Sequence, residues 1–203
     1  MVKWVEGPAS ESDVVVSTRI RLARNLKDYR FPQMMNMEES ERLTQTILNV
    51  MKDITGNMNY RFIRINNLTP VERVAYIEEH LISPGLVQRP DYSSFLLRDD
   101  ENITIMINEE DHLRIQVLLP GLNFEEGWKL ISQVDDFLEN SLDYAFHQEF
   151  GYLTACPTNT GTGLRASVMV HLPSLTASGH IKNFINNLNK RSEEHTLNSS
   201  HTS

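Results

Sequence analysis

Cysteine is nearly absent from this sequence. Cys156 is the single cysteine among 203 residues, so no disulfide can form within the chain. The start of the chain also lacks the basic and then apolar pattern of a secretory leader. Both absences favour a cytoplasmic location. The longest apolar stretches, such as residues 103–107 and 115–119, are far shorter than the roughly 20 residues of a membrane span. We therefore expect no membrane span.

An excess of positive charge is also missing. The chain has 19 Lys and Arg against 27 Asp and Glu, which gives a formal net charge of -8. Binding to nucleic acid depends largely on clustered Lys and Arg, so a general role on nucleic acid is excluded. Any arginine function must be local. With 40% hydrophobic residues, the chain is long enough for one sizeable core.

The first clear strand pattern covers residues 14–23, where side chains alternate between two faces. This alternation puts Arg19 and Arg21 side by side. Each planar guanidinium group can form two charge-assisted hydrogen bonds with phosphate oxygens, so the pair could clamp a phosphate. The spacing alone is also typical of a solvated or salt-bridged strand face.

Three helices share one start signal, a capping side chain followed three positions later by glutamate. The capping residues are Asn36, Thr69 and Asn123. Between the second and third helices, strand-like runs at 94–97, 102–107 and 112–119 are joined by short acidic turns. This pattern predicts an antiparallel meander.

A further strand over residues 165–172 and a helix over about 177–190 complete the expected elements. The order of elements predicts an α+β fold, an antiparallel sheet flanked by helices. We expect residues 1–12 to be an irregular lead-in to one domain over 13–190.

The final residues, 191–203, form a polar run that is nearly free of aliphatic side chains. A domain seldom ends its last helix in this way. The run resembles translated sequencing-adapter sequence joined to an interrupted gene, and an ordinary disordered tail is the alternative. The sequence therefore predicts a domain that is incomplete at its C-terminal end.

The turn at residues 108–111 places three acidic side chains at the tip of a hairpin, close to Arg114. Acids this close repel one another unless a cation lies over them. A guanidinium group or Mg²⁺ would satisfy Glu109 and Glu110. Acidic hairpin tips are also typical of plain solvated turns, so this segment alone leaves both interpretations open.

A third segment, residues 156–166, combines two glycines with small hydroxyl residues and contains Arg165. Such a backbone can approach a ligand closely, and Arg165 would open the next strand with its guanidinium available to phosphate. The spacing matches neither the P-loop nor the dinucleotide-binding pattern, and the common protein-kinase motifs are absent. Cys156 taken alone is also compatible with a buried structural thiol.

Together the three segments resemble the phosphagen (guanidino) kinase family. The motifs Ser-Thr-Arg-Ile-Arg (17–21), Asn-Glu-Glu-Asp-His-Leu-Arg (108–114) and Cys-Pro-Thr-Asn-Thr-Gly-Thr-Gly-Leu-Arg-Ala (156–166) occur in that family's order and approximate spacing. The resemblance covers roughly residues 13–190. It implies that family's catalytic fold, with ATP as the phosphoryl donor and Mg²⁺ as its companion ion.

The resemblance also implies roles for single residues. Arg19, Arg21, Arg114 and Arg165 correspond to the arginines that hold the ATP phosphates. Glu110 corresponds to the carboxylate that engages the substrate guanidinium, with Glu109 as the alternative, and Cys156 to the cysteine beside that group. The wider nucleotide-binding set comprises Ser17, Thr18, Ile20, His80, Ala166, Ser167, Val168 and Met169. For His80, a capping or surface role is the alternative. No residue is expected to ligate a metal directly.

Within the family, two features favour the bacterial protein-arginine kinases. Kinases of small phosphagens carry a helical domain ahead of the first arginine motif, whereas residues 1–12 alone precede it here. They also carry histidine where this sequence has Met169. The implied substrates are arginine side chains of other proteins, and an activator protein and a homodimer are further candidate partners.

Two other functions stay open. If the C-terminal part is missing, so are a further phosphate-binding arginine and a mobile glycine-rich loop that the family implies. The chain would then be a non-catalytic nucleotide-binding fragment. A kinase of a free guanidino compound is the other alternative. The implied mechanism is in-line transfer of the γ-phosphoryl group to a guanidinium nitrogen, and we expect it to be impaired in the 203-residue chain.

Overall fold

The computed structural model describes residues 3–7, 9–53 and 59–199, with side chains through Lys190. These residues divide into two compact units, one ending at Met169 and the other beginning at Val170. The first unit holds nearly the whole sheet and every predicted site residue. The second unit contains the short helix α4 (Pro173–Ala177) and the helix α5 (Ile181–Ser199).

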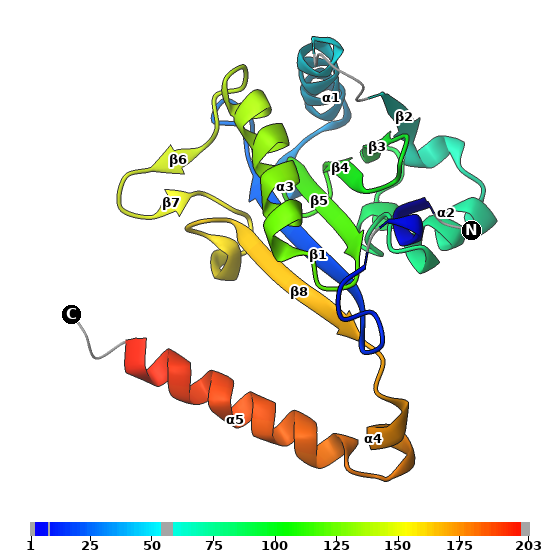
Figure 1. The fold of residues 1–203 in the computed structure, drawn as a ribbon. Coiled ribbons are helices and arrows are strands. Elements are labelled where there is room, and N and C mark those ends of the chain that lie inside the picture. Colours follow the sequence, from blue (N-terminus) through cyan, green and yellow to red (C-terminus); the bar gives the residue numbers. More distant parts are fainter. Residues whose placement is uncertain (1–2, 8, 54–58, 200–203) are drawn as a thin grey trace. The chain divides into compact units, whose positions relative to one another are not determined.

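A six-stranded sheet with the order β2-β3-β4-β5-β1-β8 forms the centre of the first unit (Figure 1). Its strands are β1 (Val15–Arg24), β2 (Tyr60–Arg64), β3 (Ser94–Arg98), β4 (Ile103–Ile107), β5 (Leu113–Pro120) and β8 (Leu164–Val170). The pairs from β2 through β1 are antiparallel. The predicted α+β fold and the predicted meander of β3, β4 and β5 are therefore confirmed.

Helices α1, α2 and α3 begin where the capping signals predict, but at α3 the Asn123 side chain makes no cap bond and donates to the carbonyl of Pro120. Their bounds are Met37–Lys52, Pro70–Glu78 and Phe124–Glu139. The Asn36 side chain accepts from the amide of Glu39 at the start of α1, and Thr69 forms a complete capping box with Glu72. These local bonds satisfy amides that the first helical turn leaves free.

One face of the sheet is largely apolar. Ile20 and Leu22 of β1 project on this side with Val117 and Ile115, their partners in β5. Helices α1 and α3 cover this face, with Ile47 and other apolar side chains in the same core cluster. Alternation along each strand sends every second side chain into this core.

The opposite face is divided into two regions. Over β3 and β4 it is apolar, where Phe95 and Met106 pack with Trp4 and residues near α2. Over β5 and β1 it carries Arg114, Gln116, Arg19 and Arg21. Apolar side chains cover the first region, whereas the second region stays polar. A charged surface therefore lies in the middle of the sheet.

Four features differ from the sequence-based expectations. Lys3–Glu6 already forms a 3-10 helix (η1), because the Trp4 ring is buried and its Nε1 donates to the carbonyl of Glu79 at 3.1 Å. Strand β2 was not expected, and neither was the small hairpin of β6 (Phe146–His147) and β7 (Gly151–Tyr152). The single helix expected over about 177–190 is replaced by α4, which ends at Ala177, and α5, which begins at Ile181 and continues to Ser199. The division of the chain at residues 12 and 190 stays a prediction.

Further 3-10 segments connect these elements. They are η2 (Pro32–Met34), η3 (Ile65–Asn67), η4 (Leu86–Gln88) and η5 (Pro157–Asn159). Segment η5 directly follows Cys156, so the predicted glycine-rich loop begins with a tight turn.

Candidate active site

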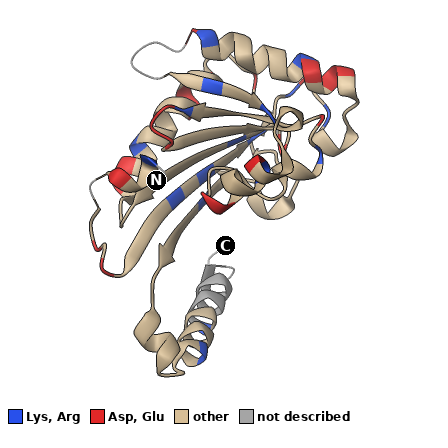
Figure 2. Cartoon of the chain, turned by 90° about the vertical axis from the view of Figure 1, so that its right-hand side faces the viewer, with Lys and Arg blue, Asp and Glu red and all other residues tan. Residues whose placement is uncertain are grey.

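Three of the predicted phosphate-binding arginines lie on one face of two paired strands. In the β1–β5 register Arg19 is opposite Leu118, Arg21 is opposite Gln116 and Ala23 is opposite Arg114. Paired residues project to the same side of a sheet, so these arginines share a face. Figure 2 shows basic positions next to one another on neighbouring strands in the middle of the sheet.

The neighbouring positive charges disfavour the protonated forms of Arg19 and Arg21. Burial, then the charges of Arg19, Arg114 and Arg165, lower the pKa of Arg21 to about 10. Burial, then Arg165 and Arg114, also lower the pKa of Arg19. The Nε of Arg21 is buried, with no hydrogen-bond partner among the residues that the structure describes. The guanidinium groups of Arg19 and Arg21 stay protonated at neutral pH, so the cluster favours an anionic ligand.

Two cavities lie along this basic face. Arg21, Arg114 and Arg165 line the first, which has a volume of about 150 Å³, together with Glu110 and Cys156. The second cavity, of about 180 Å³, is lined by Ser17, Arg19, His80, Leu118, Ser167, Val168 and Met169. The arrangement suits an elongated anionic ligand, with the acid and the thiol at one end of it.

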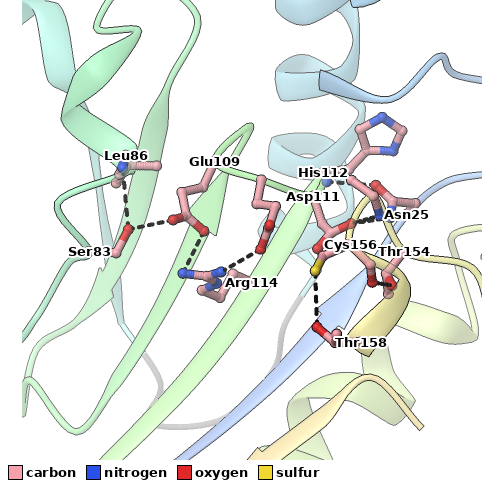
Figure 3. Close-up of polar contacts among 12 residues, drawn as sticks. Asn25, Ser83, Leu86, Glu109, Asp111, His112, Arg114, Thr154, Cys156 and Thr158 are labelled. Atoms are coloured by element: carbon pink, nitrogen blue, oxygen red, sulfur yellow. Dashed lines mark hydrogen bonds and ion pairs between the residues drawn. The ribbon is translucent and has the colours of Figure 1, made fainter. Parts of the chain in front are cut away.

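The acidic turn is neutralised from within the chain. Arg114 Nη1 lies 2.6 Å from Glu109 Oε2, and its Nη2 lies 3.2 Å from Glu110 Oε2 (Figure 3). The Glu109 side chain is only 7% exposed, whereas that of Glu110 is 39% exposed. Glu110 is therefore the carboxylate that a ligand in the first cavity can reach.

Glu109 is held in place by the segment before η4. Its Oε1 accepts from the Ser83 hydroxyl at 2.8 Å. A Cβ at Gly85 would lie 2.5 Å from that same oxygen, so a larger residue there would displace the carboxylate. Glu109 therefore belongs to the support of the turn, and its burial favours Glu110 over it as the carboxylate that meets a substrate.

The loop that carries Cys156 is closely bonded to itself and to β1. The Thr154 hydroxyl donates to the carbonyl of Cys156 at 2.7 Å, and Cys156 Sγ lies 3.0 Å from Thr158 Oγ1. At Gly163, which has a φ of 64°, an added Cβ would lie 2.6 Å from the carbonyl oxygen of Ala23. Glycine is therefore required at this position, because the backbone of Ala23 lies too close for a residue with a side chain.

Three buried residues beside the site were not anticipated. Asn25 and Asp111 bond to each other, and His112 bonds through Nδ1 to the amide of Leu26 and through Nε2 to the carbonyl of Arg30. Only their positions in the sequence could have indicated a role near the site, because Asp111 and His112 lie within the 108–114 motif and Asn25 directly follows β1. Their partners are distant in the sequence, so the bonds could not be assigned.

Arg24 was also missed. Strand alternation places it on the face opposite Arg21, where a charge must be paired. It makes two hydrogen bonds with Asp135 of α3, at 3.1 and 2.6 Å, and its guanidinium lies 3.7 Å from the centre of the Tyr152 ring. Arg24 thus anchors the loop region to α3 and takes no part in the basic cluster.

Some predicted nucleotide-binding residues lie away from this cluster. The side chains of Thr18 and Ile20 lie on the α1 and α3 face, because they occupy the alternate positions of β1. Thr18 donates to the carbonyl of Gly121 at 2.8 Å, and Ile20 belongs to the core. A contact of either residue with a nucleotide would have to use its backbone. Ala166 is exposed on β8 and lies in the lining of neither cavity. The assignment of these three residues stays a prediction.

Metal-binding clusters and membrane-spanning helices are absent from the described residues. No group of three or more His, Cys, Asp or Glu side chains in this part of the chain is placed to hold a metal ion. No described helix is both long enough and apolar enough to cross a membrane.

An arginine cluster with a carboxylate and a thiol at one end defines a site that can hold a phosphate-bearing anion beside a cationic group. Residues 39–195 match the family described as ATP:guanido phosphotransferase, C-terminal catalytic domain. The chain belongs to this family, as the sequence motifs indicated.

Curated relatives agree with this assignment. The protein-arginine kinase of Desulforamulus reducens is 47% identical over 193 residues, which is 93% of this chain and 54% of that protein. That of Moorella thermoacetica is 49% identical over 85% of this chain and 50% of that protein. The chain spans about half the length of these relatives.

Solved structures share the fold. A duplicated taurocyamine kinase from Schistosoma mansoni with bound transition state analog components has a TM-score of 0.75 and 25% identity, over 84% of this chain and 25% of that one. A lombricine kinase has a TM-score of 0.71 and 26% identity, over 84% of this chain and 51% of that one.

Proposed function

We propose that the protein transfers the γ-phosphoryl group of MgATP to arginine side chains of other proteins. The observation that supports this most directly is the first cavity, where Glu110 and Cys156 lie beside Arg21, Arg114 and Arg165. The reaction needs cations around the phosphates and an anion beside the accepting guanidinium. The lining of this cavity offers both.

The arginines supply most of the phosphate binding in this proposal. Arg19, Arg21 and Arg165 neutralise the triphosphate, and their mutual repulsion is relieved when the anion binds. Mg²⁺ enters as part of the nucleotide complex, bound through the phosphates that it accompanies. Positioning and charge neutralisation then supply most of the rate.

Glu110 has the role of orienting the accepting guanidinium. Its carboxylate aligns one guanidinium nitrogen with the γ-phosphorus and accepts a proton from that nitrogen. The new N–P bond forms as the bond from the γ-phosphorus to the bridging oxygen breaks, and the electron pair of that bond leaves with ADP. Cys156, which lines the same cavity, would add electrostatic attraction for the guanidinium without forming a covalent intermediate.

Protein arginine is the favoured acceptor. The curated relatives at 47% and 49% identity are named protein-arginine kinases, whereas the kinases of small guanidino compounds are at 25% and 26%. Met169 in the second cavity supports the same choice. We further propose a cytoplasmic site of action, because a chain with one cysteine gains nothing from an oxidising compartment. An activator protein and a homodimer are proposed as partners on the family resemblance alone.

The second candidate function is nucleotide binding without catalysis. It is favoured by one observation, namely that the curated relatives are about twice as long as this chain. The remaining length of those relatives could supply a group that transfer requires.

Incubation with radiolabelled ATP separates these functions. An arginine-rich protein, free arginine and taurocyamine are offered as acceptors, and acid-labile phosphate is measured on each. Label on the protein alone is the expected result. Label on a free compound would identify a small-molecule kinase, and nucleotide binding without any label would identify the non-catalytic alternative.

A further inference from the structure

We propose that Asn25 and Asp111 are positioning residues that hold the Glu110 turn and the Cys156 loop in a fixed relation. The two segments are distant in the sequence, and each brings one reacting group to the first cavity. A single buried contact at the end of β1 joins them (Figure 3).

Asn25 uses all of its hydrogen-bonding groups in this contact. Its Nδ2 donates to Asp111 Oδ1 at 2.7 Å and to the carbonyl of Leu153 at 3.0 Å. Its Oδ1 accepts from the amide of His112 at 2.9 Å. An amide is the side chain that offers donors and an acceptor from one planar group, so aspartate of the same shape cannot replace it.

Asp111 completes the connection. The same Oδ1 that accepts from Asn25 also accepts from the amide of Ala155 at 2.7 Å. Asp111 is 1% exposed and Asn25 is 2% exposed, so water cannot replace either bond. A buried carboxylate that loses its donors is strongly destabilised, which keeps the segments together.

Each end of this hydrogen-bonded connection lies one residue away from a reacting side chain. Asp111 follows Glu110 directly, and Ala155 directly precedes Cys156. A displacement of the buried bridge therefore moves both reacting groups. Site geometry of this kind must hold to within about 0.5 Å, and a displacement of about 1 Å can cost 10²-fold in rate.

This inference rests on the proposed function in one respect, that Glu110 and Cys156 act on the same substrate group. The mechanical coupling of the two segments can be measured without any phosphoryl transfer. A failed coupling test and a failed activity test are therefore distinguishable.

The 203-residue chain offers two direct probes. Hydrogen exchange measured by mass spectrometry reports on the backbone of residues 108–113 and 153–158. Because Cys156 is the single thiol, the rate of its alkylation by iodoacetamide reports on the loop alone.

Asn25→Asp is the main variant, because it keeps the shape, removes both donors and places two carboxylates side by side. Exchange in both segments should rise about tenfold or more, the scale of one lost hydrogen bond, and the alkylation rate of Cys156 should change with it. Exchange in β3 and β4 should stay as in the parent chain.

The double variant Asn25→Asp with Asp111→Ala closes a diagnostic cycle. Both single changes break the same contact, and Asp111→Ala also removes one of the two facing carboxylates, so their effects should not add. Exchange and alkylation in the double variant should stay near the values of Asp111→Ala alone. Ile65→Val, a change in the core cluster of the opposite sheet face, which contains no residue of either segment, is the matched control for general loss of stability.

An equal rise of exchange in all strands, or effects that add in the double variant, would show that the two residues do not act through one contact and would overturn the proposal. If Asn25→Asp does not fold, Asp111→Ala removes the acceptor without adding a buried charge. The same localised rise is expected there, and unchanged exchange in the two segments would contradict it.

Discussion

Arg114 Nη2 lies 3.2 Å from Glu110 Oε2, so a cation expected to bind phosphate is paired with the carboxylate expected to bind the substrate guanidinium. Binding of ATP and of the acceptor guanidinium must therefore break this ion pair. When phosphate oxygens take Arg114, Glu110 is released for the acceptor. Binding of one substrate should then strengthen binding of the other, and the coupling must be reciprocal.

We expect a non-hydrolysable MgATP analogue to tighten the binding of an arginine-rich protein by about fivefold or more, the low end of typical coupling. Calorimetric titrations with and without the analogue measure this factor. Glu110→Gln should remove most of the coupling, because its neutral amide no longer competes for Arg114. Equal affinities in the parent chain would contradict the competition.

In a chain extended by a relative's C-terminal half, Glu110→Gln should lower turnover by about 10²-fold, the usual scale for loss of a general base. ATP affinity should be equal or higher, because Arg114 no longer has to leave this carboxylate. Glu109→Gln is the contrasting variant, since Glu109 is buried between Arg114 and Ser83. It should reduce stability more than Glu110→Gln does. Phosphoarginine formation and thermal unfolding measure the two effects. The reverse pattern would transfer the catalytic role to Glu109.

Arg21→Gln should weaken ATP binding by about tenfold or more, because a hydrogen bond to a charged group contributes about 1.5–3 kcal/mol. The melting temperature of the unliganded chain should be equal or higher, since repulsion from Arg19, Arg114 and Arg165 is relieved. Thermal shift with and without ATP measures both. Arg61→Gln, an exposed change on β2, should alter neither value.

Acid should destabilise the fold through His112. Burial lowers the pKa of this imidazole, although the Arg30 carbonyl and the charges of Asp111 and Glu39 oppose the shift. The unfolded chain therefore binds the proton more readily, and the stabilising contribution is complete above about pH 6.5 and is lost as pH falls below it. The slope should reach at most about 1.4 kcal/mol per pH unit.

Urea unfolding between pH 5 and pH 8 measures this slope. His112→Gln should flatten it and lower stability at pH 8, because glutamine cannot reproduce both ring contacts with Leu26 and Arg30. His171→Gln, which changes an exposed histidine, should leave the slope in place. An unaltered slope in His112→Gln would assign the acid sensitivity to another group.

Extension of the chain should raise its activity. β8 is an edge of the described sheet, and its residues are exposed or half-buried. Exposed edges and apolar surface favour association, so residues 1–203 alone should also aggregate more readily. A chain extended by a relative's C-terminal half should form phosphoarginine about 10³-fold faster, if that half supplies an arginine for the transferring group. Equal specific activities would refute this.

Local signals in the sequence predicted most of the fold. The α1 and α2 starts depend on neighbouring residues, and the β3–β5 meander on short turns, so each can be identified in a short window. β2 has only half-buried and exposed residues and pairs at the far side of β3, so no local pattern marked it. Trp4 is ordered by contacts with residues that lie far along the chain.

The site was predictable where its residues follow motifs. Strand alternation correctly put Arg19 and Arg21 on one face, and the motif resemblance brought Arg114 and Arg165 to the same cluster. The same alternation also separates Thr18 and Ile20 from them. The bonds of Asn25 with Asp111 could not be predicted, because they depend on the packing of segments 86 residues apart.

Strand β1 gives one set of alternate residues to the core and the other set to the site. A deletion of one residue within it would send Arg19 and Arg21 into the packing against α1 and α3 and bring Ile20 and Leu22 to the surface. Such a chain would fail to fold before its loss of catalysis could matter. Insertions and deletions in β1 would therefore harm folding as well as phosphate binding, so the spacing of the two arginines is tied to the spacing of the core residues that alternate with them.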